Sequence, residues 1–365
     1  MVELLSPAGN FECMVAAVQA GCNAVYLSGK LFGARSFAGN FDNIELSKAV
    51  EYCHLHQVKV YVTVNTIVLE SEFSELDEYL EFLNKINIDA VIVQDLGVLR
   101  LIKTKYPLIE VHASTQMNVF NENGAKILKE MGVSRVVLAR ETDIEEVKKI
   151  SKIIDTEIFI HGALCFSSSG NCLMSSAIGR RSGNRGKCAQ PCRKLYSIYE
   201  DDKLIVENKS ILSMKDLMTL DNLEEILESG TSSLKIEGRM KSPEYVYTVT
   251  KAYREAIDEY YKKNNYFIPK KTLENILVTF NRSFTKGYLL NEENKNIVNH
   301  NFVNHRGIEI GKIIKEYPRC IFHVDGTQAV GKKNVDLTPK GDPIRDKSLI
   351  NLYKPDAGST SADYL

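Results

Sequence analysis

Four of the eight cysteines in this chain of 365 residues lie in one short stretch. The stretch reads HGALCFSSSGNCLMSSAIGRRSGNRGKCAQPCRKLY and contains Cys165, Cys172, Cys188 and Cys192. Thiolates are soft ligands, so four of them suit a zinc ion or an iron–sulfur cluster. We therefore take these four side chains as candidate metal ligands.

The spacing of the four cysteines favours an iron–sulfur cluster. Six, fifteen and three residues separate them, whereas structural zinc sites place about two to four residues between paired cysteines. Only Cys188 and Cys192 have that spacing, and the Gly/Ser/Arg-rich span with Pro191 beside Cys192 is more typical of an iron–sulfur loop. Zinc is the alternative, and disulfides or free thiols are a third interpretation.

The chain carries no sign of export or membrane insertion. Its first residues, MVELLSPAGN, lack the basic segment and apolar core of a signal peptide. No apolar run approaches the roughly 18 residues that a membrane-spanning helix needs. We expect a cytoplasmic protein without membrane contact, in a compartment where disulfides are rare.

Composition argues against a chain that attracts nucleic acid as a whole. The formal net charge is −1, and the contents of 44% apolar and 25% charged residues are ordinary for a globular protein. RNA binding would therefore need a local basic patch. One candidate is the basic loop, residues 180–194, and a solvated surface loop is the alternative. Its cations are Arg180, Arg181, Arg185, Lys187, Arg193 and Lys194.

The elements that must position these residues alternate between β-type runs and helical patterns over the first 240 residues. Continuous Val/Ile-rich strands separated by helices are typical of a parallel sheet buried on both faces. Eight such units predict an α/β fold, a (β/α)₈ TIM-like barrel, with an open doubly wound sheet as the alternative. The runs are 3–9, 24–29, 59–65, 90–97, 110–118, 135–141, 157–165 and 232–239.

Functional residues in such barrels lie at the carboxyl ends of the strands, and the cysteine loop follows the seventh strand to the same mouth. Polar groups there cost free energy unless they are paired or used, so the set predicts either a ligand site or a polar network that closes the barrel. The candidate catalytic residues are Arg239, Glu237, His161 and His112. The candidate cofactor-binding residues are Arg35, Arg140 and Lys235, and the remaining polar strand-end residues include Asn65, Gln94, Asp95, Thr115, Gln116 and Glu141.

The pattern changes after the eighth run. The segment PEYVYTVTKAYREAIDEYYKK predicts a helix with proline in its first turn. We predict a barrel with its cysteine loop over 1–242, and a helical segment that leads into a small, incomplete C-terminal α+β domain over 243–316. Residues 317–365 form an atypical tail without clear periodicity. Cys13, Cys22 and Cys53 are expected to be packing residues near the first two helices.

These motifs resemble the collagenase-like peptidase family, family U32, over roughly residues 1–316. The segments KIEGRMKSPEYV and FNRSFTKGYLL are hallmarks, with Ser283 where the family carries glycine, and NHRGIEIGK resembles the beginning of the family's C-terminal part. The family signature lies in EIFIHGALCFSSSGNCLMSS, at Glu157, Phe159, Gly162, Ala163, Cys165, Gly170, Cys172 and Ser175.

The resemblance implies a particular chemistry. Many family members resemble prephenate-dependent RNA hydroxylases, or oxygen-independent hydroxylases of ubiquinone synthesis, with a 4Fe-4S cluster on four cysteines. This chain is most similar to the branch that makes 5-hydroxyuridine at the tRNA wobble position. The resemblance thus implies the four cysteines as iron–sulfur ligands, prephenate as co-substrate, tRNA as partner and a paralogous partner subunit. Prephenate is a dicarboxylate, which suits the cations at the barrel mouth.

Two alternative functions stay open. The family name implies a collagenase-like peptidase, although the chain has no GxSxG elbow, no HExxH motif and no obvious Ser/His/Asp set. A quartet of clustered cysteines is also not a nucleophile arrangement. The other alternative is a non-enzymatic RNA-binding or accessory protein.

The tail departs from the family. The segment FHVDGTQAVGK resembles a strand of pyridoxal-phosphate enzymes of the cysteine desulfurase type, in which the residue matching Asp325 pairs with the cofactor ring nitrogen. The Schiff-base lysine motif that follows in those enzymes is missing here. We therefore assign no pyridoxal site and interpret the tail as a truncation or junction.

Overall fold

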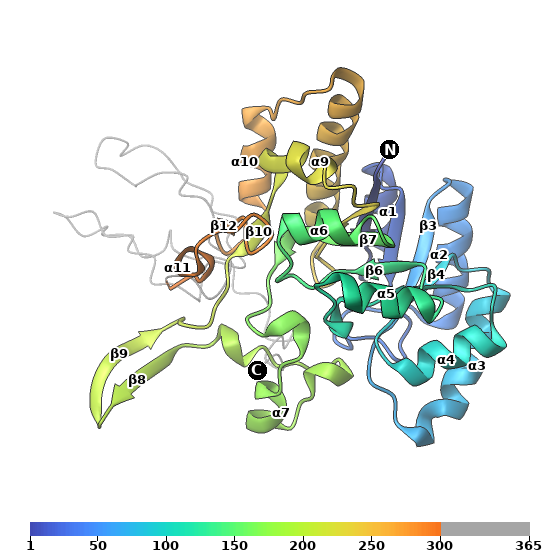
Figure 1. The fold of residues 1–365 in the computed structure, drawn as a ribbon, viewed down its shortest axis with the longest axis horizontal. Coiled ribbons are helices and arrows are strands. Elements are labelled where there is room, and N and C mark those ends of the chain that lie inside the picture. The colour runs from blue at the N-terminus through green and yellow to red at the C-terminus, as the bar shows by residue number, and fades with distance from the viewer. Residues whose placement is uncertain (301–365) are drawn as a thin grey trace, which may run out of the picture. The chain divides into compact units, whose positions relative to one another are not determined.

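The computed structural model describes residues 1–300, except for the side chains of Asn294 and Lys295. Within it, eight parallel strands close into a barrel because β11 pairs with both β1 and β7 (Figure 1). This confirms the predicted (β/α)₈ barrel and excludes the open sheet. The predicted tail and the end of the preceding segment lie outside the described residues. The strands are β1 (Glu3–Pro7), β2 (Ala24–Leu27), β3 (Lys59–Val64), β4 (Ala90–Val93), β5 (Glu110–Ala113), β6 (Arg135–Val137), β7 (Asp155–Ala163) and β11 (Ser233–Ile236).

Helices follow the strands, and polar side chains define their first turns. Asp42 and Glu45 form a reciprocal capping box on α2, and the Asn10 side chain accepts a hydrogen bond from the backbone N–H of Cys13 in α1. Gly132 follows α5 at a φ of 84°, a left-handed conformation that glycine adopts without strain. The helices before the cysteine loop are α1 (Phe11–Gln19), α2 (Asn43–Leu55), α3 (Phe73–Lys85), α4 (Leu96–Lys105), α5 (Glu122–Glu130) and α6 (Ile144–Ile150).

Helix α9 (Pro243–Lys263) acts as the eighth helix of the barrel. It begins with Pro243 in its first turn, as the sequence predicts, and Ser242 is its N-cap. It packs against α1 and β1, and the Tyr253 hydroxyl donates to the Ile160 carbonyl of β7 at 2.9 Å. No helix of the described residues is long and apolar enough to cross a membrane.

The core has two parts, one between the strands and the helices and one inside the barrel. The inner part contains Leu5, Tyr61, Ile92 and Phe159, which come from four different strands. Burial on both faces explains why the strands read as continuous apolar runs.

A long insertion separates β7 from β11. It contains the four clustered cysteines, helix α7 (Met174–Gly179), and a hairpin of β8 (Tyr196–Glu200) and β9 (Lys203–Lys209). The hairpin projects as an arm, and both of its faces are largely exposed (Figure 1). Strand β10 (Asp216–Met218) then runs antiparallel to β7. The remaining elements are α8 (Leu223–Leu227), α10 (Lys270–Val278), β12 (Phe284–Thr285) and α11 (Asn294–Ile297).

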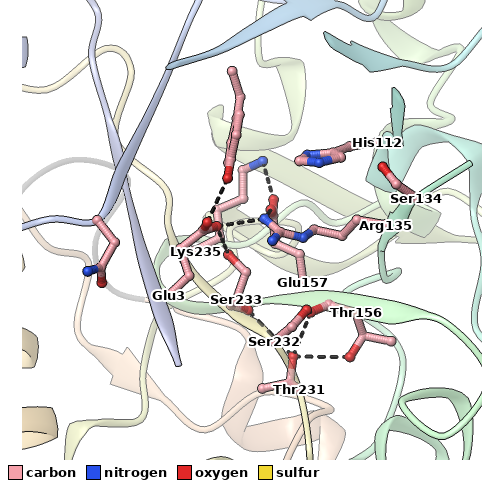
Figure 2. A network of polar contacts seen from close by, with 12 residues as sticks. Glu3, His112, Ser134, Arg135, Thr156, Glu157, Thr231, Ser232, Ser233 and Lys235 are labelled. Atoms are coloured by element: carbon pink, nitrogen blue, oxygen red, sulfur yellow. Dashed lines mark hydrogen bonds and ion pairs between the residues drawn. The ribbon is translucent and has the colours of Figure 1, made fainter. Parts of the chain in front are cut away.

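Two carboxylates, the partly buried Glu3 and the fully buried Glu157, link the strands across the barrel interior (Figure 2). Glu3 accepts hydrogen bonds from Tyr61 at 2.6 Å, Arg135 at 2.6 Å and Ser233 at 2.8 Å. Glu157 accepts one from the Lys235 ammonium at 2.7 Å, and its other oxygen lies 3.6 Å from Arg135. The network ties β1, β3, β6, β7 and β11 together.

Glu157 is completely buried, yet its environment keeps it charged. Burial alone would raise the pKa of Glu157, but the Lys235 and Arg135 cations outweigh it and lower that pKa. Removing the carboxylate charge would leave both cations without this partner in the interior.

We predict that Glu157→Gln lowers the free energy of unfolding by about 3–5 kcal/mol, the typical effect of breaking a buried ion pair. Urea denaturation monitored by circular dichroism measures this. Glu146→Gln removes an exposed ion pair with Lys149 on α6 and serves as the control, with stability close to the wild type. Equal stability of the wild type and Glu157→Gln would contradict a structural role for the buried charge.

Candidate functional site

A cavity opens at the carboxyl ends of the barrel strands, with an empty volume of about 1570 Å³ that includes its mouth. Its wall combines strand-end residues with the cysteine loop. The structure thereby brings all four predicted metal ligands to one cavity, together with five of the seven other candidate residues. These five are Arg35, Arg140, Lys235, Glu237 and Arg239.

Cys192 lies among the other three cysteines of the loop, and two of the sulfurs accept backbone hydrogen bonds. Burial raises the pKa of the Cys192 thiol, Arg193 acts in the opposite direction, and Cys165, Cys188 and Cys172 raise it further. The Cys172 sulfur accepts a hydrogen bond from the Met174 backbone N–H at 3.3 Å. The Cys188 sulfur accepts one from Gln190 at the same distance. Backbone N–H groups that donate to cysteine sulfurs are a common feature of iron–sulfur sites.

The donor set is suited to a metal centre with soft ligands. Four cysteines lie on one cavity wall, and two of their sulfurs accept backbone N–H hydrogen bonds. Within residues 1–300, no three His, Cys, Asp or Glu side chains are grouped closely enough to hold a single metal ion.

Backbone contacts hold the cysteine loop against the first part of the barrel. Gly186 has a φ of 77°, and a Cβ atom there would lie 2.5 Å from the Gly33 carbonyl oxygen. The Gly186 carbonyl accepts hydrogen bonds from the Ser36 hydroxyl at 2.8 Å and the Ser36 N–H at 3.3 Å. Only glycine permits this conformation together with so close an approach.

Side chains complete the attachment of the loop. Arg185 makes two hydrogen bonds to Glu72, at 2.7 and 2.5 Å, and a third to the Ile67 carbonyl. Glu141 accepts hydrogen bonds from the Ser169 N–H at 2.9 Å and the Ser169 hydroxyl at 2.6 Å. Arg185 and Glu141 therefore position the loop.

The guanidinium of Arg140, on the cavity wall, has no ion-pair or hydrogen-bond partner among the described residues. It stacks on the Phe159 ring, 4.0 Å from the ring centre, and its Nε is buried without a hydrogen-bond partner. Arg239, in contrast, donates to Thr63 at 3.0 Å and to Asn40 at 2.6 Å. Burial lowers the pKa of Arg239 to about 10, so it stays charged at neutral pH. Both arginines can attract an anion, and Arg140 has more donors to offer.

The other candidate residues on the wall each have a partner of opposite charge. Arg35 and Glu237 form a loose ion pair at 4.0 Å at the rim. Lys235 lies deeper, where its ammonium pairs with Glu157 and sits 4.3 Å from the centre of the Tyr26 ring. Lys235 thus contributes charge to the cavity floor while it completes the interior network.

The structure does not bring His112 and His161 to the cavity wall. His112 is buried in the barrel interior against the Tyr61 ring. His161 is buried among Tyr245, Tyr253 and Phe284. Burial lowers the pKa of His161 to about 3, so the imidazole is neutral.

The cavity wall also contains three cationic residues that the sequence analysis did not predict as catalytic or cofactor-binding. Arg193 was assigned to the basic loop, but it turns inward and donates to the Leu164 and Met214 carbonyls and to the Ser213 hydroxyl. Arg282 pairs with Asp216 at 2.9 Å. Lys241 lines the wall two residues beyond Arg239. The hallmark segments KIEGRMKSPEYV and FNRSFTKGYLL contain Lys241 and Arg282. These two motifs could therefore have indicated both residues as site candidates.

The remaining cysteines of the described part pack in the core. Cys13 on α1, Cys22 after α1 and Cys53 on α2 are buried free thiols. Burial raises the pKa of each of them.

The model of peptidase family U32 matches residues 9–299, most of the described chain. The chain belongs to this family. An uncharacterized protease of Methanocaldococcus jannaschii is 38% identical over 94% of this chain and 94% of its own length.

Two other relatives carry names that refer to RNA. The tRNA hydroxylation protein P1 of Bacillus subtilis is 39% identical, and the alignment covers 77% of this chain and 69% of that protein. The 23S rRNA 5-hydroxycytidine C2501 synthase of Escherichia coli is 35% identical over 86% of this chain and 49% of the synthase. This chain therefore spans about half the length of the synthase.

We predict that His161 makes the fold sensitive to acid. Its pKa falls from 6.5 to about 3 on folding, so between these values the unfolded chain binds a proton that the folded chain does not. Stability therefore decreases as the pH drops from about 6.5 towards 3. Urea denaturation across this pH range should give a shallower loss for His161→Gln than for the wild type. His56→Gln, which removes an exposed histidine, is the control, and identical slopes for all three proteins would contradict the prediction.

Proposed function

We propose that this chain is an iron–sulfur enzyme that hydroxylates the wobble uridine of tRNA to 5-hydroxyuridine with prephenate as co-substrate. One observation carries the proposal. Four cysteines line the same cavity wall as Arg140, whose Nε is buried without a hydrogen-bond partner. Family membership and the names of two relatives, a tRNA hydroxylation protein and an rRNA hydroxycytidine synthase, support RNA hydroxylation in general.

Cys165, Cys172, Cys188 and Cys192 would hold the 4Fe-4S cluster. When bound, such a cluster supplies one-electron redox chemistry. The chain's own contribution is to donate the N–H groups of Met174 and Gln190 to the sulfurs of Cys172 and Cys188, and to fix the loop through Arg185 and Gly186.

Prephenate carries two carboxylates, and the wall offers matching cations. Arg140 presents a guanidinium without a carboxylate partner among the described residues, over the Phe159 ring. A planar guanidinium held in this way binds a carboxylate through two parallel hydrogen bonds. Arg239 lines the same cavity and offers a second positive charge.

Only some cations of the basic loop are exposed and able to contact tRNA. Arg185 and Arg193 are engaged within the fold, whereas Arg180, Lys187 and Lys194 are exposed. Arg181 stacks on Phe37 at the cavity wall, 4.7 Å from the ring centre. Exposed cations next to an aromatic ring are the groups that bind phosphates and stack on unpaired bases.

The peptidase alternative finds less support at this site. No histidine lines the cavity, and no Ser or Cys side chain of the described residues is hydrogen-bonded to a histidine. A thiol or hydroxyl nucleophile would lack the adjacent base that acyl transfer needs.

We predict that protein purified without oxygen contains about four iron and four sulfide ions per chain, with the visible absorption of an iron–sulfur cluster. Cys172→Ser should lose most of the iron, because a hydroxyl is a poor ligand for this soft site. A deletion strain that expresses Cys172→Ser should keep unmodified wobble uridines, as measured by nucleoside mass spectrometry.

Cys53→Ala is the matched control, because Cys53 is buried on α2 away from the cavity. It should keep the iron and restore hydroxylation. Stoichiometric zinc in place of iron would contradict the cluster, and cleavage of peptides by metal-free wild-type protein would favour the peptidase.

We predict that Arg140→Gln keeps the iron content but raises the apparent KM for prephenate roughly tenfold, the effect of losing one charge-assisted hydrogen bond. Hydroxylation of tRNA at varied prephenate concentrations measures this. Arg180→Gln removes an exposed loop cation outside the cavity and should leave that KM unchanged. An unchanged KM in Arg140→Gln would remove Arg140 from the prephenate site.

A further inference from the structure

Lys241 is a cavity-wall lysine that the proposed function leaves without a role. It lies in the turn between β11 and α9, where its backbone N–H donates to the Gly238 carbonyl at 2.9 Å. Its own carbonyl accepts a hydrogen bond from the Cys13 thiol at 3.4 Å. A turn fixed to the last strand and to α1 presents the side chain from a rigid support.

The amine of Lys241 has no carboxylate or hydrogen-bond partner among residues 1–300. Its Nζ lies 3.1 Å from the centre of the Phe280 ring and 5.7 Å from that of Tyr245. Lys235, the other lysine of the cavity wall, is ion-paired with Glu157. Among the lysines of the wall, Lys241 alone therefore offers an uncommitted amine to a ligand.

The surroundings make this amine nucleophilic near neutral pH. Burial lowers the pKa of Lys241 to about 8. Asp216 and Glu237 act against this shift, whereas Arg282 and Arg193 reinforce it. A desolvated lysine beside other cations is an established route to an amine that attacks carbonyl groups.

The cavity also selects the kind of carbonyl compound. Arg140 and Arg239 line the same wall and attract carboxylates. Tyr26 and Phe159 supply apolar surface beside them. A ligand with a ketone next to a carboxylate would satisfy both the amine and the arginines.

We propose that Lys241 captures the ketone of a 2-oxo carboxylate as an imine. The neutral Nζ attacks the carbonyl carbon and forms a C–N bond. Both amine hydrogens leave with the carbonyl oxygen as one water molecule, so no oxidant or reductant is required. Prephenate contains such a ketone, and the identity of the natural ligand rests on the proposed function.

Reductive trapping tests the inference, because borohydride converts an imine into a stable secondary amine. The full-length protein is incubated with pyruvate or with prephenate, reduced, digested and mapped by mass spectrometry. We expect one reduced adduct on the peptide that contains Lys241, and none with lactate, which lacks the ketone. Lys235 and the exposed Lys251 should stay unmodified, and Lys241→Arg should lose the adduct while keeping the positive charge.

Two results would overturn the capture site. One is wild-type protein that shows no adduct on Lys241 with either keto acid, and the other is labelling of Lys251 at the same level as Lys241. An adduct on Lys241 in wild-type protein that fails to hydroxylate wobble uridines would support the capture site and overturn the hydroxylase proposal. Normal hydroxylation by Lys241→Arg, with no adduct in the wild type, would overturn the capture site alone.

Discussion

The pairing of buried charges inside the barrel is the constraint on which the rest of the molecule depends. Glu3 and Glu157 stand on β1 and β7, the two neighbours of the closing strand β11, and both accept hydrogen bonds from that strand. A carboxylate left unpaired in this interior would cost several kcal/mol. When the barrel closes correctly, these charged groups find their partners. Closure also brings the carboxyl ends of the eight strands together around one mouth.

The same requirement divides the polar residues of the mouth into two groups. Asp95 caps α4 through the N–H groups of Gly97 and Val98, and Glu141 holds Ser169 of the cysteine loop. These side chains are satisfied by the protein itself and cannot bind a ligand without losing a structural contact. Arg140 and Lys241 lack such partners, and for that reason they have the greatest capacity to act on a ligand.

The sequence was sufficient to predict the barrel strands but not the partners of their side chains. Val/Ile-rich runs indicated the strands, because each run is a local pattern. The number of runs indicated a closed barrel. The partner of Arg185 is Glu72, 113 residues earlier, and Lys235 pairs with Glu157 across 78 residues. Residue type alone cannot show that such cations are already engaged, so Arg185 was assigned to an RNA surface. The hairpin of β8 and β9 was also missed, although Asp201 and Asp202 form a tight turn between two runs that contain β-branched and aromatic residues.

The attachment of the cysteine loop has a consequence for the order in which the molecule assembles. Ser36 and Gly186 are 150 residues apart, and the contacts of Arg185 reach back over more than 110. Contacts between such distant segments form late, since the intervening chain must first lose its freedom. The cysteine loop can therefore pack only after the barrel wall has formed. Until then the four thiols stay apart. A nascent chain would therefore bring its four clustered thiols together as one of the last events of folding, after most of the core is already in place.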